Sequence, residues 1–80
     1  MCGQFTIRYI LVNGETSDIR VRDDETIREL MEELEEKTGY PVENQMLLFN
    51  GQVLAPDSTI ESSKVQPGDS IHITPNLVGG

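Results

Sequence analysis

The stretch TIRELMEELEEKTG, residues 26–39, decides the fold of this 80-residue chain. Thr26 is followed three residues later by Glu29, which is the capping-box spacing that begins a helix. Gly39 can adopt the left-handed backbone conformation that ends a helix, and Pro41 prevents the helix from continuing. Between these limits, apolar side chains recur on one helix face: Ile27, Leu30, Met31 and Leu34. The sequence therefore predicts one amphipathic helix whose apolar face needs a covering layer.

The other side of this helix is acidic. Lys37 lies in the predicted last turn, where a cation offsets the helix dipole. The remaining positions of this side are glutamates, at residues 32, 33, 35 and 36. We expect them to form a solvated helix face.

A hairpin precedes the helix. Residues 5–12 begin with apolar and polar residues in alternation, which predicts a strand, and Asn13-Gly14 is a strong signal for a tight turn. Residues 16–22 predict the second strand, with Ile19 and Val21 on one face. The hairpin therefore has one apolar face, and the helix is placed to cover it.

A second hairpin follows the helix. The short apolar segments 46–49 and 52–54 flank Asn50-Gly51, another tight-turn signal. Beyond them, residues 55–68 are punctuated by Pro, Asp, Ser and Gly, with Ile60 and Val65 as isolated apolar positions.

The last predicted strand is Ser70-Ile71-His72-Ile73-Thr74, in which polar and apolar residues alternate. Its two isoleucines face inward and His72 and Thr74 face outward. Because Pro75 has no backbone donor, we expect the strand to end before it.

This element order predicts an α+β protein of the β-grasp class, with a mixed sheet of four to five strands and one main helix packed across it. The fold class implies that the first and last strands pair in parallel. We expect residues 1–4 to be a flexible N-terminus, residues 5–75 to form the domain, and residues 76–80 to be a flexible C-terminal tail.

Composition argues against several classes of function. The net charge of −8 would repel the phosphates of a nucleic acid. No apolar run approaches the length of a membrane span and no signal peptide is evident, so we expect no membrane association. The single cysteine, Cys2, fits a reducing compartment, and we expect a cytoplasmic monomer. No phosphate-binding loop or metal-ligand pattern occurs, so we expect no cofactor and no enzymatic activity.

The sequence closes with Gly79-Gly80. Glycine has no Cβ, so another protein can approach its backbone closely. An activated glycyl carboxylate is also the least hindered acyl group that a protein can offer to a nucleophile. The pair predicts that function depends on the Gly80 carboxylate.

The chain resembles ubiquitin, without a gap, from about Phe5 to Gly80. Its most specific segments are Thr26-Ile27 at the helix start, Gly39-Tyr40-Pro41, and Gln45-Met46-Leu47-Leu48-Phe49-Asn50-Gly51 followed by Leu54. The spacing of Ser58-Thr59-Ile60, Val65 and Ser70-Ile71-His72-Ile73 also matches.

This resemblance implies a ubiquitin-like protein modifier. An activating enzyme would adenylate the Gly80 carboxylate with ATP and carry it as a thioester. A conjugating enzyme, with a ligase, would then join it to a lysine amine of a target protein through an isopeptide bond. The activating enzyme would read the tail residues Asn76, Leu77 and Val78, and a protease would remove any residues that follow Gly80 in a precursor.

The resemblance also implies an interaction patch on the exposed face of the sheet. The matching positions are Val12, Leu48, His72 and Thr74. Ubiquitin has basic residues around its patch and in its tail, and this chain has none at the matching positions. The residues there are Ile10, Glu15, Met46, Gln52, Asn76 and Val78. This difference suggests recognition by a dedicated activating enzyme. Only Lys37 matches a ubiquitin lysine that could link copies into chains, and its simpler interpretation is the dipole cation described above.

Two other functions remain open. A sulfur carrier would use the same glycine carboxylate but convert it to a thiocarboxylate. An adaptor domain of a longer protein would use only the surface around Val12, Leu48 and His72, with Gly-Gly as the start of a linker.

Overall fold

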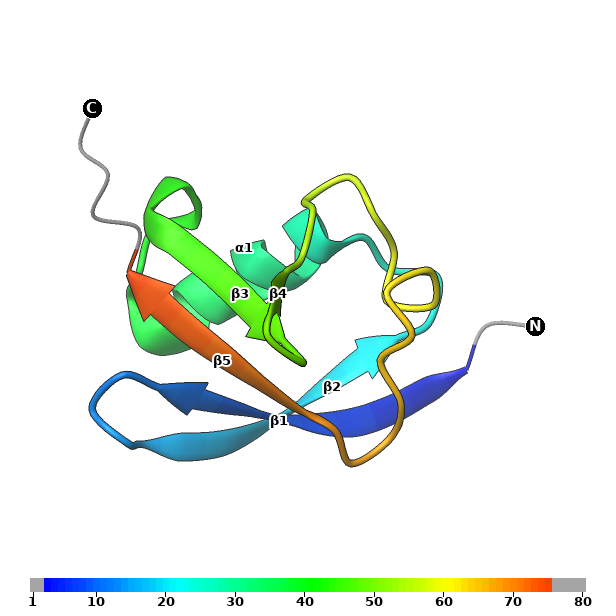
Figure 1. The fold of residues 1–80 in the computed structure, drawn as a ribbon, viewed down its shortest axis with the longest axis horizontal. Coiled ribbons are helices and arrows are strands. Elements are labelled where there is room, and N and C mark those ends of the chain that lie inside the picture. The colour runs from blue at the N-terminus through cyan, green and yellow to red at the C-terminus, as the bar shows by residue number, and fades with distance from the viewer. Residues whose placement is uncertain (1–2, 76–80) are drawn as a thin grey trace.

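One helix packs across one face of a five-stranded sheet (Figure 1). The computed structural model describes residues 3–75. Its elements are β1 (Gln4–Leu11), β2 (Thr16–Arg22), α1 (Ile27–Thr38), a 3-10 turn η1 (Val42–Asn44), β3 (Gln45–Phe49), β4 (Gln52–Val53) and β5 (Ser70–Pro75). Among these residues, no helix has the length and apolar character needed to cross a membrane.

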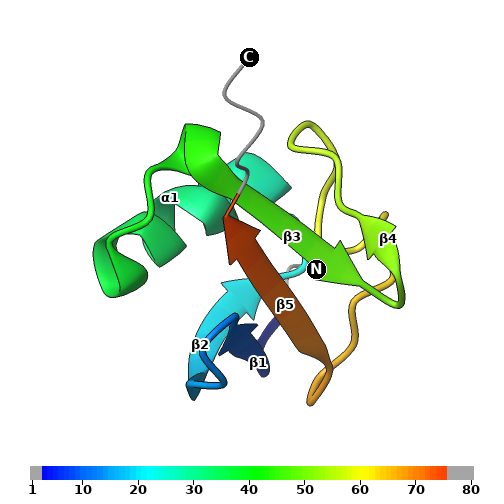
Figure 2. The same cartoon turned by 60° about the vertical axis from the view of Figure 1, so that its left-hand side comes forward.

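The strands lie in the order β2-β1-β5-β3-β4. β5 therefore occupies the centre of the sheet, between β1 and β3 (Figure 2). It pairs in parallel with β1, while the other pairings are antiparallel. This confirms the β-grasp class and the parallel pairing of the first and last strands.

The capping box at the start of α1 is formed as predicted. The Glu29 backbone N–H donates to Thr26 Oγ1 at 3.1 Å, and the Thr26 N–H donates to Glu29 Oε1 at 2.9 Å. At the other end Gly39 has a φ of 84° and its N–H donates to the Glu35 carbonyl. The local sequence therefore sets both limits of the helix.

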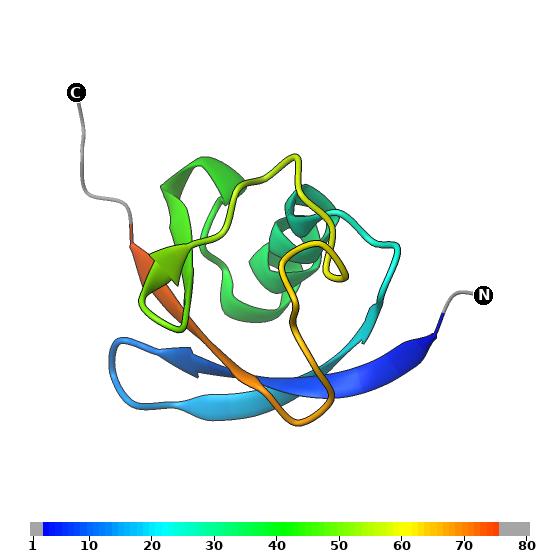
Figure 3. The ribbon, with the colours of Figure 1, turned by 45° about the vertical axis from the view of Figure 1, so that its right-hand side comes forward.

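The connection from β4 to β5 satisfies the other free donors at the helix start. The Ile27 N–H donates to the Ser58 carbonyl at 2.8 Å, and the Arg28 N–H donates to the Pro56 carbonyl at 3.0 Å. Figure 3 shows this segment, in yellow and orange, passing beside the start of α1. The first turn of the helix is thus held by a distant part of the chain as well as by its own cap.

The turn between β3 and β4 has a left-handed backbone at both central residues. Asn50 has a φ of 54° and Gly51 a φ of 79°. Positive values at both positions are those of a type I′ turn, whose twist matches that of the flanking strands.

The core lies between the sheet and α1. It contains all four apolar residues of the predicted helix face, both inward residues of β2, and the two isolated apolar positions of the long connection. Its members are Ile7, Tyr9, Ile19, Val21, Ile27, Leu30, Met31, Leu34, Leu47, Leu54, Ile60, Val65, Ile71 and Ile73.

The element limits differ from expectation in small ways. β1 begins at Gln4, inside the segment expected to be flexible, and β4 ends at Val53 rather than Leu54. β5 includes Pro75, whose Cα pairs with that of Gln45, so the expectation that the strand ends before Pro75 was wrong. Proline lacks the donor but keeps a carbonyl acceptor, which is enough for the final position of a strand.

Candidate functional site

Four residues form a row across the face of the sheet that is turned away from α1. Ile10 of β1 pairs with His72 of β5, His72 pairs with Leu48 of β3, and Leu48 pairs with Val53 of β4. Paired residues in neighbouring strands project to the same face. The register therefore places the predicted patch residues Leu48 and His72 side by side.

The neighbouring row of the sheet explains why this one is solvent-facing. Ile73 of β5 pairs with Leu11 on one side and Leu47 on the other, and both Ile73 and Leu47 are fully buried under α1. Because successive side chains in a strand alternate between faces, His72 and Leu48 must point the other way. Leu48 is half-buried on that outer surface, and His72 is exposed.

A second pair extends the surface toward the end of β5. Met46 pairs with Thr74, and Thr74 Oγ1 donates a hydrogen bond of 3.4 Å to the Met46 carbonyl. Both residues are half-buried. Thr74 thus lies on the predicted face, but its hydroxyl is engaged with the sheet backbone.

Within residues 3–75, two large apolar residues are strongly exposed. Val12, one residue beyond β1, is 58% exposed, and Val53 is 59% exposed. We call Ile10, Met46, Leu48 and Val53 the apolar patch, since the register brings them together around His72 and Thr74. Val12 is exposed as predicted, but no strand pairing joins it to this row.

The sequence-based prediction missed three members of the apolar patch. Ile10 and Met46 were noted only as replacements for basic residues. Val53 was assigned to a short strand, with no prediction of which face of the sheet it lies on. The sequence did contain a usable signal. Residues two apart in a strand lie on the same face, so Ile10 shares the outward face of the polar residue Arg8.

Charged groups border the apolar patch on the side of β2. Arg8 of β1 pairs with Asp18 of β2, and their side chains form an exposed ion pair with Nε and Oδ1 3.7 Å apart. An apolar centre with a polar border is the arrangement of many protein-binding surfaces. Within residues 3–75, no group of three or more His, Cys, Asp or Glu residues is placed to hold a metal ion.

Lys37 is exposed in the last turn of α1, where it can act as the dipole cation. The predicted tail residues Asn76, Leu77 and Val78 and the conjugation residues Gly79 and Gly80 lie outside the described residues.

Comparison with known proteins gives a consistent result. The model of the Ubiquitin family matches residues 5–76. The chain is 33% identical over 63 residues to the NEDD8-like protein RUB3 of Arabidopsis thaliana, covering 79% of this chain and 81% of that protein. It is 27% identical over 74 residues to the ubiquitin-like protein NEDD8 of Dictyostelium discoideum, covering 92% of this chain and 96% of that protein.

One longer relative is matched only in part. The chain is 34% identical over 56 residues to the ubiquitin domain-containing protein DSK2 of Saccharomyces cerevisiae. That alignment covers 70% of this chain but 15% of the relative.

Among solved structures, the fold is similar to a designed protein described as based on ubiquitin. The TM-score is 0.87 and the sequence identity 35%, with 96% of this chain and 94% of the designed chain covered.

Proposed function

This chain belongs to the ubiquitin family, and from that premise we propose that it is a protein modifier joined to other proteins through the carboxylate of Gly80. The observation that carries the proposal is the position of Gly79-Gly80. The family match ends at residue 76, and the two glycines follow closely, four residues after β5 ends at Pro75. β5 is central in the sheet, so the residues after Pro75 follow a strand that is paired on both sides.

The relatives matched over most of their own length support this proposal over a role as part of a longer protein. The two NEDD8-type relatives are covered to 81% and 96%, so their size is close to that of this domain.

The proposed chemistry has three steps, each performed by a partner enzyme. ATP adenylates the Gly80 carboxylate and releases pyrophosphate. A cysteine thiol of the activating enzyme displaces AMP and forms a thioester, which passes to a conjugating enzyme. A lysine amine of the target then attacks the thioester carbonyl, which releases the thiol and forms the isopeptide bond. The chain is thus a substrate and supplies no catalytic group.

The apolar patch is the proposed contact for receptors and enzymes. It lies on four paired strands of the sheet, so receptors and enzymes can bind it in the free and the conjugated protein. The tail and the patch would therefore do separate tasks.

The proposal is tested by trapping the activated glycine. The full chain is incubated with ATP, hydrazine and extract from cells that express it, and its intact mass is measured. Hydrazine attacks an acyl adenylate or thioester and leaves a hydrazide, so we expect an adduct that depends on ATP and maps to Gly80. A variant lacking Gly79 and Gly80 should give no adduct. Leu48→Glu leaves the tail intact, so comparing it with that variant separates the loss of the glycine carboxylate from the loss of binding at the apolar patch.

Three outcomes are informative. A Gly80 hydrazide together with high-mass conjugates of the chain supports a modifier. A Gly80 thiocarboxylate without conjugates would replace the modifier with a sulfur carrier. No adduct, in an extract that activates a known modifier, would overturn both.

The partial match to the DSK2 protein favours a second candidate, a non-conjugated adaptor domain. This function needs the apolar patch and not Gly80. Removal of Gly79 and Gly80 would leave adaptor binding unchanged, whereas Leu48→Glu would abolish it.

A further inference from the structure

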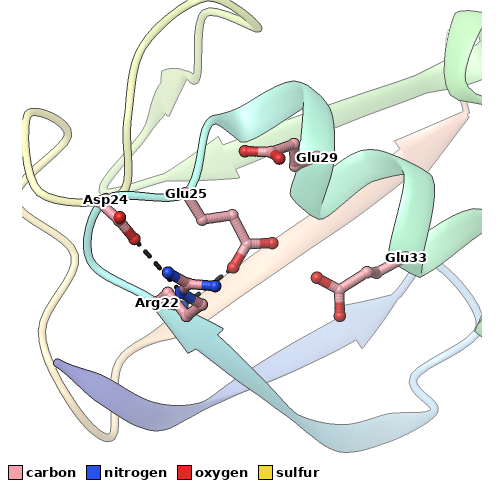
Figure 4. A pocket seen from close by; sticks show the side chains of 5 residues that line it. All are labelled: Arg22, Asp24, Glu25, Glu29 and Glu33. Atoms are coloured by element: carbon pink, nitrogen blue, oxygen red, sulfur yellow. Dashed lines mark hydrogen bonds and ion pairs between the residues drawn. The ribbon is translucent and has the colours of Figure 1, made fainter. Parts of the chain in front are cut away.

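An acidic recess lies between the edge strand β2 and the first half of α1. It has a volume of about 250 Å³ and is lined by Arg22, Asp24, Glu25, Glu29 and Glu33. In Figure 4 the carboxylates of Glu25 and Glu33 point toward the same space. Four carboxylates and one guanidinium thus surround one small volume.

Glu25 differs from the other carboxylates because it is buried. Its residue is 8% exposed, and its backbone is held on both sides: the N–H donates to the Arg22 carbonyl at 3.1 Å, and the carbonyl accepts from the Ile60 N–H at 2.9 Å. Rotation of the side chain into solvent would break the hydrogen bond that its Oε1 accepts from the Arg22 N–H.

Only one oxygen of the Glu25 carboxylate has a donor. Oε1 accepts from the Arg22 backbone N–H at 3.0 Å, whereas the buried Oε2 has no hydrogen-bond donor among the described residues. A buried carboxylate oxygen without a donor is costly. The Glu25 and Glu33 carboxyls can share a hydrogen bond only while one of them carries a proton, so once both are ionised residues 3–75 supply no donor to Oε2.

The nearby charges leave this deficit open. Arg22 Nε lies 3.4 Å from Asp24 Oδ1, and Arg20 Nη2 donates to Gln4 Oε1 at 3.4 Å in the adjoining recess that Glu25 and Glu33 also line. Glu29 already accepts from the Thr26 N–H through its Oε1. Burial, then the hydrogen bond and negative charge of Glu33, raise the pKa of Glu25 from 4.5 to about 7. Above that pH Glu25 is ionised among the other acidic residues of the recess, whose lining also includes Arg22.

We propose that this recess binds the guanidinium group of an arginine side chain from a partner protein. A guanidinium is planar, carries five N–H donors and is weakly hydrated, so one group can donate to Glu25 Oε2 and to the Glu33 carboxylate together. A metal ion does not fit, because no cluster among residues 3–75 has coordinating geometry. The net charge of −8 also attracts basic partners over longer distances.

The first test uses a capped arginine, N-acetyl-L-arginine N-methylamide, as the probe. It is titrated into the isotopically labelled full chain at pH 8 and constant ionic strength, while the side-chain carboxyl carbons of Glu25 and Glu33 are followed by NMR. We expect saturable shifts of both. Glu33→Gln should weaken binding by about tenfold, which corresponds to the loss of roughly one charge-assisted contact. Glu32→Gln, the same charge change one residue away on the exposed face, should weaken it by less than about twofold.

Other cations and the pH dependence separate a site from general attraction. Tetramethylammonium chloride, which has no donor, should give no saturable shift, and capped lysine should bind more weakly than capped arginine. Affinity should fall when the pH is lowered from 8 to 5.5, because a proton then occupies Glu25, and Glu25→Gln should remove most of this dependence. Equal effects of Glu33→Gln and Glu32→Gln, or equal shifts with tetramethylammonium, would overturn the proposal.

Free L-arginine distinguishes the source of the guanidinium. Free arginine carries an α-ammonium and an α-carboxylate, which must lose hydration near the recess, where the capped form has neutral amides, so it should bind more weakly than the capped form. Binding as tight as that of the capped form would point to a free amino acid and overturn a protein partner. The proposal does not depend on Gly80, so failure of the hydrazide experiment leaves it intact.

Discussion

The Gln45 side chain donates a hydrogen bond of 2.8 Å to the carbonyl of Met31, joining the first residue of β3 to the middle of α1. The same Nε2 also donates to the Tyr40 carbonyl at 2.9 Å. Gln45 is buried, so water cannot replace these donors. One amide group thus holds together the helix, the loop that follows it and the sheet.

Replacing Gln45 by methionine should therefore destabilise the fold. Methionine has a similar volume but no donor, so two buried hydrogen bonds are lost, at a cost of about 1 to 3 kcal/mol. Urea unfolding followed by circular dichroism measures the change. Gln52→Met, at an exposed position of β4, should alter stability by less than about 0.5 kcal/mol. Similar losses in the two variants would show that the Gln45 contacts contribute nothing specific.

A second prediction concerns the turn at Asn50-Gly51. Gly51 has a φ of 79° and open space where a Cβ would be placed, so an alanine there suffers from backbone conformation and not from a clash. We expect Gly51→Ala to cost about 1 kcal/mol. Gly3→Ala, where no left-handed φ is needed, is the matched control and should be close to neutral. A neutral Gly51→Ala in thermal unfolding would contradict the type I′ turn.

A third prediction follows from the alternation in β3. Leu47 is 1% exposed under α1, while its neighbour Leu48 is half-buried on the outer surface. Leu47→Glu should unfold the domain, because a charge cannot be buried there without a partner. Leu48→Glu should remain folded, with a loss below about 2 kcal/mol. The pair of circular dichroism spectra tests the face assignment, and equal behaviour of the two variants would refute it.

The fourth prediction is a pH dependence of stability. The pKa of Glu25 is about 7 in the fold against 4.5 ordinarily, so between these values the folded chain keeps a proton that the unfolded chain has lost. The contribution of this group is complete below about pH 4.5 and is lost as the pH rises through about 7. Glu25→Gln should therefore stabilise the protein at pH 8, by about 1 to 3 kcal/mol, and have little effect at pH 4.5.

Urea unfolding of this variant across the pH range measures the slope. Gln can still accept from the Arg22 N–H, so the main change is the loss of the titrating charge. Glu32→Gln, which is exposed, controls for the change in net charge. Equal stabilisation by both variants at pH 8 would mean that the burial of Glu25 is irrelevant.

Local patterns were sufficient to predict most of the fold. The capping box, the Gly39 stop and both Asn-Gly turns each contain their physical cause within four residues, so the hairpins and the helix could be located from sequence. Ile60 and Val65 were predicted only as isolated apolar positions, and both are core residues.

The site was less predictable because it depends on register. The row Ile10-His72-Leu48-Val53 joins four strands, and its alignment is a tertiary property that no single segment encodes. Glu25 was missed for the opposite reason. A glutamate beside Asp24 in a polar turn has the appearance of a solvated residue, and only the junction of β2, α1 and the Ile60 backbone buries it.

The central place of β5 also determines when the sheet can be completed during synthesis. Its pairing with β1 joins residues about sixty positions apart, so this ladder closes a long loop and forms late. A ribosome makes the two hairpins and the helix first, but the halves of the sheet have no common neighbour until Ser70–Pro75 has been added. Gly80 is added later still. If Gly80 is the conjugation site, as proposed, a nascent chain therefore cannot offer its carboxylate before the strand that unites the sheet has been made.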